Sequence, residues 1–162
     1  MAGKYPALIA LGANLGKPRE TFARALDAIS SDADVLAVSG LWASPAWPPG
    51  SGAPDYVNSV AGVRTDLTAE AMLDRLHAIE AAEGRVRTER NAPRTLDLDL
   101  LDHAGAVRAG GPVLPHPRLQ DRAFVLLPLW EVAPDWTHPV TGRGVWEMMG
   151  RLPDVSGMRR LR

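Results

Sequence analysis

Short apolar runs and amphipathic segments alternate in the first part of the chain. The run at 7–11 (Ala-Leu-Ile-Ala-Leu) predicts a buried strand, which we expect to stop at the turn-forming residues 12–16. Pro18 suits the first turn of a helix. That helix has one apolar face, because four hydrophobic residues follow at helical spacing: Phe22, Ala25, Leu26 and Ile29.

The middle of the chain predicts two more strands and a second helix. Residues 35–41 alternate as a strand does, and strand character returns at 56–63. Between them, residues 44–54 contain four prolines and two glycines, which predicts a loop. We expect the second helix to begin with Thr68 as its N-cap and to end at Gly84.

The last part of the chain predicts a strand at 94–102, a hairpin around the glycine-rich turn 110–112, and helices at 123–132 and 145–152. This order of elements predicts an α+β fold. We expect a ferredoxin-like βαββαβ antiparallel sheet with helices on one face, followed by extra C-terminal elements. A length of 162 residues is close to the usual size of one domain, so we expect a single domain over residues 1–162.

Composition then narrows the classes of function. A formal net charge of −1 gives no global basic field that would recruit nucleic acid or an anionic membrane, so an anionic ligand needs a local arginine cluster. The absence of cysteine excludes disulfides, thiolate zinc sites and cysteine nucleophiles. No apolar run reaches the roughly 18–20 residues that span a bilayer, and the first residues lack the apolar core of a secretion signal. We therefore expect a cytoplasmic protein.

An alternating acidic strand is the first candidate for chemistry. In the run 95–100 (Thr-Leu-Asp-Leu-Asp-Leu), Asp97 and Asp99 point to one face of the strand, at most about 7 Å apart. Two like charges repel, and a divalent cation removes that conflict. Carboxylate oxygens suit Mg²⁺, which usually takes one or two carboxylates and completes its shell with water and phosphate oxygens. A solvated face, or pairing with neighbouring arginines, is the alternative.

An arginine-rich segment precedes this strand. Arginine binds phosphate oxygens with a planar fork and stays charged, so a cluster beside a metal-binding strand would neutralise a triphosphate. A solvated basic loop balanced by Glu83 and Glu89 is the alternative. The cluster consists of Arg85, Arg87, Arg90 and Arg94.

These motifs carry a resemblance to a known family. The run 94–99 (Arg-Thr-Leu-Asp-Leu-Asp), preceded by 84–87 (Gly-Arg-Val-Arg), resembles the signature of the 6-hydroxymethyl-7,8-dihydropterin pyrophosphokinases. Further blocks agree in order and span nearly the whole chain. They are 11–16 (LGANLG), 55–58 (DYVN), 114–118 (LPHPR), 122–126 (RAFVL) and 131–134 (EVAP).

The resemblance implies site residues at the matching positions. Asp97 and Asp99 would bind two Mg²⁺ ions, and with Arg85 and Arg94 they would form the catalytic group. The implied ATP-binding residues are Glu80, Arg85, Arg87, Arg94, His116 and Arg122. The implied pterin-binding residues are Ser44, Pro45, Trp47, Tyr56, Asn58 and Phe124, with Tyr56 and Phe124 stacking on the ring.

The resemblance also implies the reaction. The pterin hydroxyl would attack the β-phosphorus of ATP, AMP would leave, and the product would enter folate synthesis. Loops 44–54 and 84–93 are candidate lids that exclude water. Asn91 stands where a tryptophan is familiar in the family, in an arginine loop that is one residue shorter, so we expect altered loop closure rather than another substrate. The implied partners are ATP and hydroxymethyl-dihydropterin, with no nucleic acid, no membrane and a monomeric chain.

Two other classes of protein fit part of the pattern. A different magnesium-dependent nucleotidyl- or phosphotransferase would explain the carboxylates and the arginine loop, but not Tyr56, Asn58 and Phe124 together. A ferredoxin-like RNA-binding module would need an aromatic-rich strand signature, which this chain lacks.

Overall fold

The computed structural model describes residues 5–46, 48–84 and 95–162, and its elements follow one another as a mixture of strands and helices. They are β1 (Ala7–Ala13), α1 (Pro18–Ile29), β2 (Asp34–Val38), β3 (Trp42–Ser44), β4 (Tyr56–Arg64), α2 (Ala69–Ala82), β5 (Asp97–His103), β6 (Arg108–Ala109), β7 (Val113–Leu114), a 3₁₀ turn (Leu119–Asp121), α3 (Ala123–Val132), α4 (Val145–Gly150) and β8 (Arg159–Arg160).

The main sheet has the strand order β5-β1-β4-β3-β8, and β2 pairs with β4 beside β3. Within the described residues, every pairing in this sheet is antiparallel. A separate hairpin joins β6 to β7, as the glycine-rich turn predicts. The fold is therefore α+β with an antiparallel sheet.

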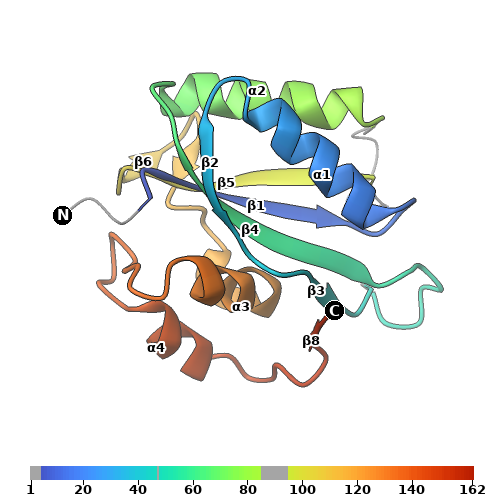
Figure 1. Ribbon diagram of the computed structural model, residues 1–162. Coiled ribbons are helices and arrows are strands. Elements are labelled where there is room, and N and C mark those ends of the chain that lie inside the picture. Colours follow the sequence, from blue (N-terminus) through green and yellow to red (C-terminus); the bar gives the residue numbers. More distant parts are fainter. Residues whose placement is uncertain (1–4, 47, 85–94) are drawn as a thin grey trace.

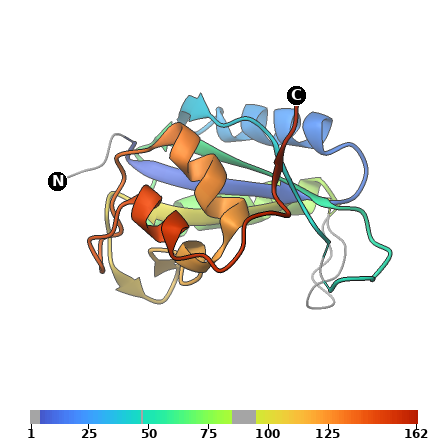
Figure 2. The same cartoon turned by 90° about the horizontal axis from the view of Figure 1, so that it is seen from below.

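Helices cover both faces of the sheet (Figure 1). On one face, α1 and α2 pack against side chains such as Ile9, Leu11 and Val63 and form the larger core. On the other face, α3 and α4 pack over Leu8 and Val60 and form a second core. Figure 2, seen from below, shows α3 and α4 lying across this second face. The expectation of helices on one face holds for α1 and α2 only, because the C-terminal helices bury the opposite side.

The helix boundaries follow the local signals in the sequence. Pro18 is at the start of α1. The Thr68 hydroxyl accepts a hydrogen bond from the Ala71 amide at 3.1 Å and so caps α2. Gly84 follows α2 with φ of +82°, a conformation that costs glycine little. The expected helix at 123–132 coincides with α3.

Several strand boundaries differ from expectation, and the strand expected at 94–102 is β5 at Asp97–His103. β1 continues through Gly12 to Ala13, because β4 and β5 pair with it on both sides. The strand expected at 35–41 ends at Val38 as β2, and a separate strand that was not expected, β3, begins at Trp42. At the break the Ser39 hydroxyl accepts the hydrogen bond of the Val60 amide at 2.9 Å, in place of a strand carbonyl. β8, which pairs with β3, was not predicted from the sequence.

The described residues contain no helix that is both long and apolar enough to pass through a bilayer.

Removing the cap of α2 tests the local origin of this helix. We expect Thr68→Ala to lower the free energy of unfolding by about 1 kcal/mol, because the Ala71 amide loses its acceptor. Thr68→Ser keeps the hydroxyl and is the matched control. Chemical denaturation of the three proteins measures the difference, and equal stability of both variants would contradict the assignment.

Candidate functional site

β5 presents its two carboxylates to the face of the sheet that α3 covers. Leu98 and Leu100 point into the core beneath α1 and α2. Side chains alternate along a strand, so Asp97 and Asp99 share the opposite face with Leu101, which belongs to the second core. Both aspartates are only partly buried. The carboxylates therefore face solvent at the border of the second core.

The register of three strands assembles the floor of the site. Gly12 on β1 lies between Asn58 on β4 and Asp97 on β5. Ala10, two residues earlier on β1, is opposite Asp99. A Cβ at Gly12 would lie 3.7 Å from Asn58 Oδ1 and 4.0 Å from Asp97 Cβ. Because Gly12 has no side chain, the space between Asn58 and Asp97 stays part of the cleft.

A cleft of about 940 Å³ lies above this floor and brings together predicted site residues from four elements. β3, β4, β5 and the start of α3 each contribute to its lining. The predicted residues that line it are Ser44, Pro45, Tyr56, Asn58, Asp97, Asp99, Arg122 and Phe124. These positions are spread over 81 residues of sequence, from 44 to 124, so only the fold makes them neighbours.

Some predicted residues lie elsewhere. Arg85, Arg87, Arg94 and Trp47 are outside the described residues, as is the arginine loop with Asn91. Of the described residues, Glu80 and His116 do not line the cleft.

Glu80 holds the carboxylate strand from below. It is 1% exposed on α2, and its Oε2 accepts a hydrogen bond from the Leu98 amide at 2.9 Å. β5 is at the end of the strand order, so its outward amides need partners from outside the sheet. Glu80 therefore fixes the segment that carries Asp97 and Asp99, while its predicted contact with ATP stays a prediction.

His116 lies beside the cleft as a neutral imidazole. Burial, helped by the positive charges of Arg122 and Arg118 and opposed by Asp97, lowers the pKa of His116 to about 4. Its Nδ1 accepts a hydrogen bond from the Arg118 amide at 3.2 Å. The proton is therefore on Nε2, which leaves that nitrogen as a donor.

The orientation of the Asn58 amide is fixed by its neighbours. Its Nδ2 donates to the Trp42 carbonyl at 3.0 Å and to the Ser44 hydroxyl at 2.9 Å. A carbonyl can only accept, so the nitrogen must face Trp42. Both amide hydrogens are used within the protein. Asn58 therefore offers its Oδ1, and not its Nδ2, to a ligand.

The start of α3 supplies a cation and an aromatic ring. Arg122 is the N-cap residue of α3, and its guanidinium lies 5.3 Å from the centre of the Phe124 ring. Phe124 is 37% exposed, so much of its ring is open to a ligand. Tyr56, at the start of β4, lines the same cleft. An anion and a flat ring can thus be bound next to each other.

The carboxylate pair fits a hard cation. Within the described part of the chain, no group of three or more His, Asp or Glu could hold a metal by itself. Asp97 and Asp99 could share a cation with oxygen atoms of water or of a ligand. Mg²⁺ is usually bound in this way, by one or two carboxylates together with water and substrate phosphates.

Sequence reasoning missed several residues of the cleft. Gly12 was assigned to a turn, although its strand pairing makes it the floor. Residues 154–158 also line the cleft through Asp154, Val155, Gly157 and Met158. No local pattern marks that segment, because its place depends on a long-range strand pairing. Two histidines away from the cleft make contacts within the fold: His103 contacts the Leu67 carbonyl, and His138 accepts a hydrogen bond from the Val140 amide.

Partly exposed carboxylates, an arginine and aromatic rings around one cleft are features of enzymes that handle a phosphorylated ligand and a planar one. Comparison with known proteins gives the family. The sequence profile of 7,8-dihydro-6-hydroxymethylpterin-pyrophosphokinase (HPPK) matches residues 8–134. The chain belongs to the HPPK family.

Individual relatives align with this chain over most of their length. The 2-amino-4-hydroxy-6-hydroxymethyldihydropteridine pyrophosphokinase of Pseudomonas aeruginosa is 43% identical over 157 residues, 94% of this chain and 94% of that protein. The enzyme of the same name from Haemophilus influenzae is 40% identical over 136 residues, 82% of this chain and 84% of that protein.

A solved structure described as HPPK-DHPS in complex with substrates has a similar fold. It superposes with a TM-score of 0.70 at 12% sequence identity. The match covers 96% of this chain and 46% of that longer chain.

The state of His116 predicts a pH dependence. The unfolded chain takes up this proton near the usual pKa of 6.5, and the folded chain only near 4. The stabilising contribution is therefore complete above about pH 6.5 and is lost as the pH falls toward 4.

An NMR titration of the His116 ring protons should show no protonation between pH 8 and about 5, because the pKa is about 4. His116→Gln identifies the signal, and its unfolding free energy should depend less on pH in this window. A midpoint near 6.5 for His116 would contradict the buried neutral form.

Proposed function

We propose that this protein transfers the diphosphate of ATP to 6-hydroxymethyl-7,8-dihydropterin and releases AMP, a step in folate synthesis. One observation carries the proposal. A single cleft contains the carboxylates Asp97 and Asp99 on β5, at one end of the strand order, together with Tyr56 and Asn58 on β4 and Phe124 at the start of α3, which are the residues proposed to bind the pterin. The relatives from Pseudomonas aeruginosa and Haemophilus influenzae carry the name of this activity.

Asp97 and Asp99 would hold Mg²⁺ together with phosphate oxygens of ATP. When bound, the ion neutralises phosphate charge and orients the diphosphate that is transferred. The partial exposure of both carboxylates leaves room for the other ligands of the ion. Binding of two ions is the finer form of this proposal.

The phosphate side of the cleft is completed by cationic and neutral donors. Arg122 points a permanent positive charge into the cleft from the start of α3. Arg85 and Arg94 are proposed to add to it. His116 would donate from Nε2 as a neutral group, since its low pKa keeps it uncharged at neutral pH.

The pterin side supplies shape and hydrogen bonds. Tyr56 and Phe124 offer aromatic faces, and such stacking contributes about 0.5–1.5 kcal/mol beyond the buried area. Asn58 offers Oδ1 to ring N–H groups, because its Nδ2 is held by Trp42 and Ser44. This acceptor favours a heterocycle with N–H donors on its edge.

The reaction follows from positioning and charge neutralisation. The pterin hydroxyl attacks the β-phosphorus in line, and AMP leaves. Asp97 is close enough to the cleft floor to be a candidate for accepting the hydroxyl proton. We also propose the ferredoxin-like assignment of the β1-α1-β2-β4-α2-β5 order. The single domain, the monomeric state, the cytoplasmic location and closure of loop 44–54 stay predictions.

Product analysis tests the function. Purified protein with ATP, Mg²⁺ and hydroxymethyl-dihydropterin should yield AMP and the pterin diphosphate in equal amounts. Release of ADP or of free diphosphate would instead support another phospho- or nucleotidyltransferase. Salt-sensitive RNA binding without turnover would support the RNA-binding class.

Neutralising either carboxylate tests the metal site. We expect Asp97→Asn and Asp99→Asn each to lower kcat about a hundredfold or more, because the charge that binds the cation is lost. Asp74→Asn, an exposed aspartate on the outer face of α2, is the matched control. Circular dichroism checks that the fold is kept. Full activity in either active-site variant would reject the assignment.

A further inference from the structure

The C-terminal segment 154–158, which we call the C-terminal wall, forms part of the cleft. Asp154, Val155, Gly157 and Met158 line it. The segment lies beyond residues 8–134, over which the family profile matches. Its contribution to the cleft therefore comes from the structure and was not carried by the motifs on which the family match rests.

The C-terminal wall packs directly against Pro45. A Cβ on Gly157 would lie 2.9 Å from Pro45 Cγ and 3.2 Å from its Cδ, which is closer than side chains normally approach. The proline ring is rigid, so only glycine allows this approach without a shift of one segment. Pro45 and Ser44 belong to the side of the cleft proposed to hold the pterin.

Strand pairing places the wall at the pterin end of the sheet. β8 pairs with β3, with Arg160 opposite Trp42 and Arg159 opposite Ala43. The Leu161 amide donates to the Leu41 carbonyl at 2.8 Å. In the order β5-β1-β4-β3-β8, the wall's anchor lies at the opposite end from the carboxylate strand. The wall thus adjoins the residues proposed to bind the pterin.

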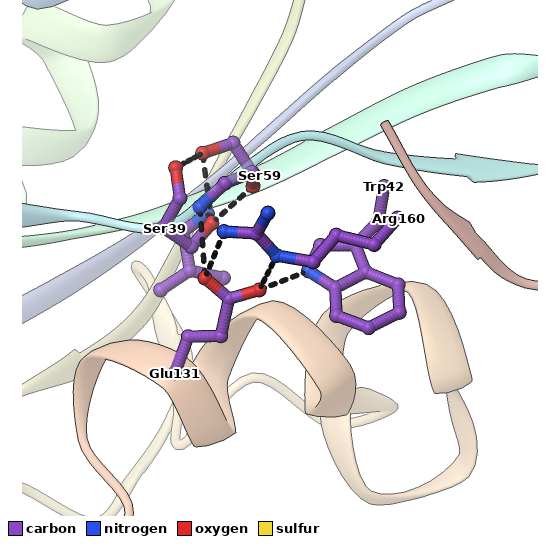
Figure 3. Close-up of polar contacts among 7 residues, drawn as sticks. Ser39, Trp42, Ser59, Glu131 and Arg160 are labelled. Atoms are coloured by element: carbon purple, nitrogen blue, oxygen red, sulfur yellow. Dashed lines mark hydrogen bonds and ion pairs between the residues drawn. The ribbon is translucent and has the colours of Figure 1, made fainter. Parts of the chain in front are cut away.

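Glu131 on α3 binds Arg160, on the strand β8 that follows the wall, and also binds Trp42 of β3 and the segment before it (Figure 3). Its Oε1 accepts from Trp42 Nε1 at 2.7 Å and from Arg160 Nε at 2.9 Å. Its Oε2 accepts from the Gly40 amide at 3.0 Å and from Arg160 Nη2 at 3.3 Å. Burial would raise the pKa of Glu131, but these hydrogen bonds, led by that of Arg160, lower it below its usual value. The carboxylate is therefore ionised and fully bonded at neutral pH.

Gly40 leaves the space that the Arg160 guanidinium occupies. A Cβ at this position would overlap the Arg160 guanidinium, so the guanidinium packs directly on the backbone of Gly40. Trp42, which Glu131 holds by its indole, also accepts the Asn58 amide through its carbonyl. The same cluster consequently fixes the C-terminal wall and the strand that orients Asn58.

We propose that the C-terminal wall is a side of the pterin pocket and sets pterin affinity, with Glu131 and Arg160 as the positioning residues that hold it in place. This inference rests on the proposed function, because it assigns a substrate to one side of the cleft. ATP, bound at the β5 side, does not depend on the wall.

A single added methyl group tests the wall. We expect Gly157→Ala to raise the KM and Kd for the pterin about tenfold, since the wall must move relative to Pro45, and to leave the KM for ATP within about twofold. Gly150→Ala is the matched control: it is nearby in the sequence, and its Cβ would meet no atom within 4 Å. Unchanged pterin affinity, or an equal loss of affinity for ATP, would overturn the proposal.

A second variant tests the positioning pair. Arg160→Met removes the bonds to Glu131 at an exposed site, and we expect the KM for the pterin to rise about fivefold with little change in kcat. Arg64→Met is the matched control, because Arg64 pairs with Asp34 between neighbouring strands at 2.9 Å, away from the cleft lining. Equal effects of the two variants, or no effect of Arg160→Met, would overturn the role of the pair.

Measurements on the wild-type protein distinguish a failure of the wall proposal from a failure of the proposed function. If it forms AMP with the pterin and the variants behave as their controls do, the wall proposal alone fails. If the wild type neither binds the pterin nor forms AMP, the proposed function fails, and the wall proposal fails with it.

Discussion

The antiparallel alignment of β1 between β4 and β5 is the constraint on which the site depends. It places Gly12 between Asn58 and Asp97, so that the residue proposed to bind the pterin and the residue proposed to bind the cation line the same side of the cleft. A shift of one residue would turn the carboxylates of β5 toward the core beneath α1 and α2. Burying charges there would be costly, so the hydrophobic core and the site demand the same register.

The two faces of the sheet differ in how completely helices cover them. The face beneath α1 and α2 is closed and apolar and supplies most of the packing. The face beneath α3 is apolar at one end and opens into the cleft at the other. Arg122 and Phe124 reach the cleft because they start α3, whose remaining turns are anchored in the second core. The residues proposed to bind ligands are thus mounted on an element that burial holds rigid.

Two acids outside the cleft lining support the site, the buried Glu80 and the partly exposed Glu131. Glu80 bonds the outward amide of Leu98 and holds the strand of the carboxylates. Glu131 binds Arg160, Trp42 and the Gly40 amide, and so joins α3 to β3 and the C-terminal strand. In both cases a carboxylate accepts the hydrogen bonds, and hydrogen bonds to a charged group are stronger than those between neutral groups.

The sequence by itself determined the elements with strong local signals and the chemistry of the motifs. Pro18, Thr68 and Gly84 set helix ends through local backbone physics, and strict alternation put Asp97 and Asp99 on one face. Tertiary structure alone decided which face that was, that β1 continues through a glycine, and that the C-terminal segment returns to form a wall. These features depend on pairing between strands far apart in the sequence, and such pairing leaves no periodic trace in either strand.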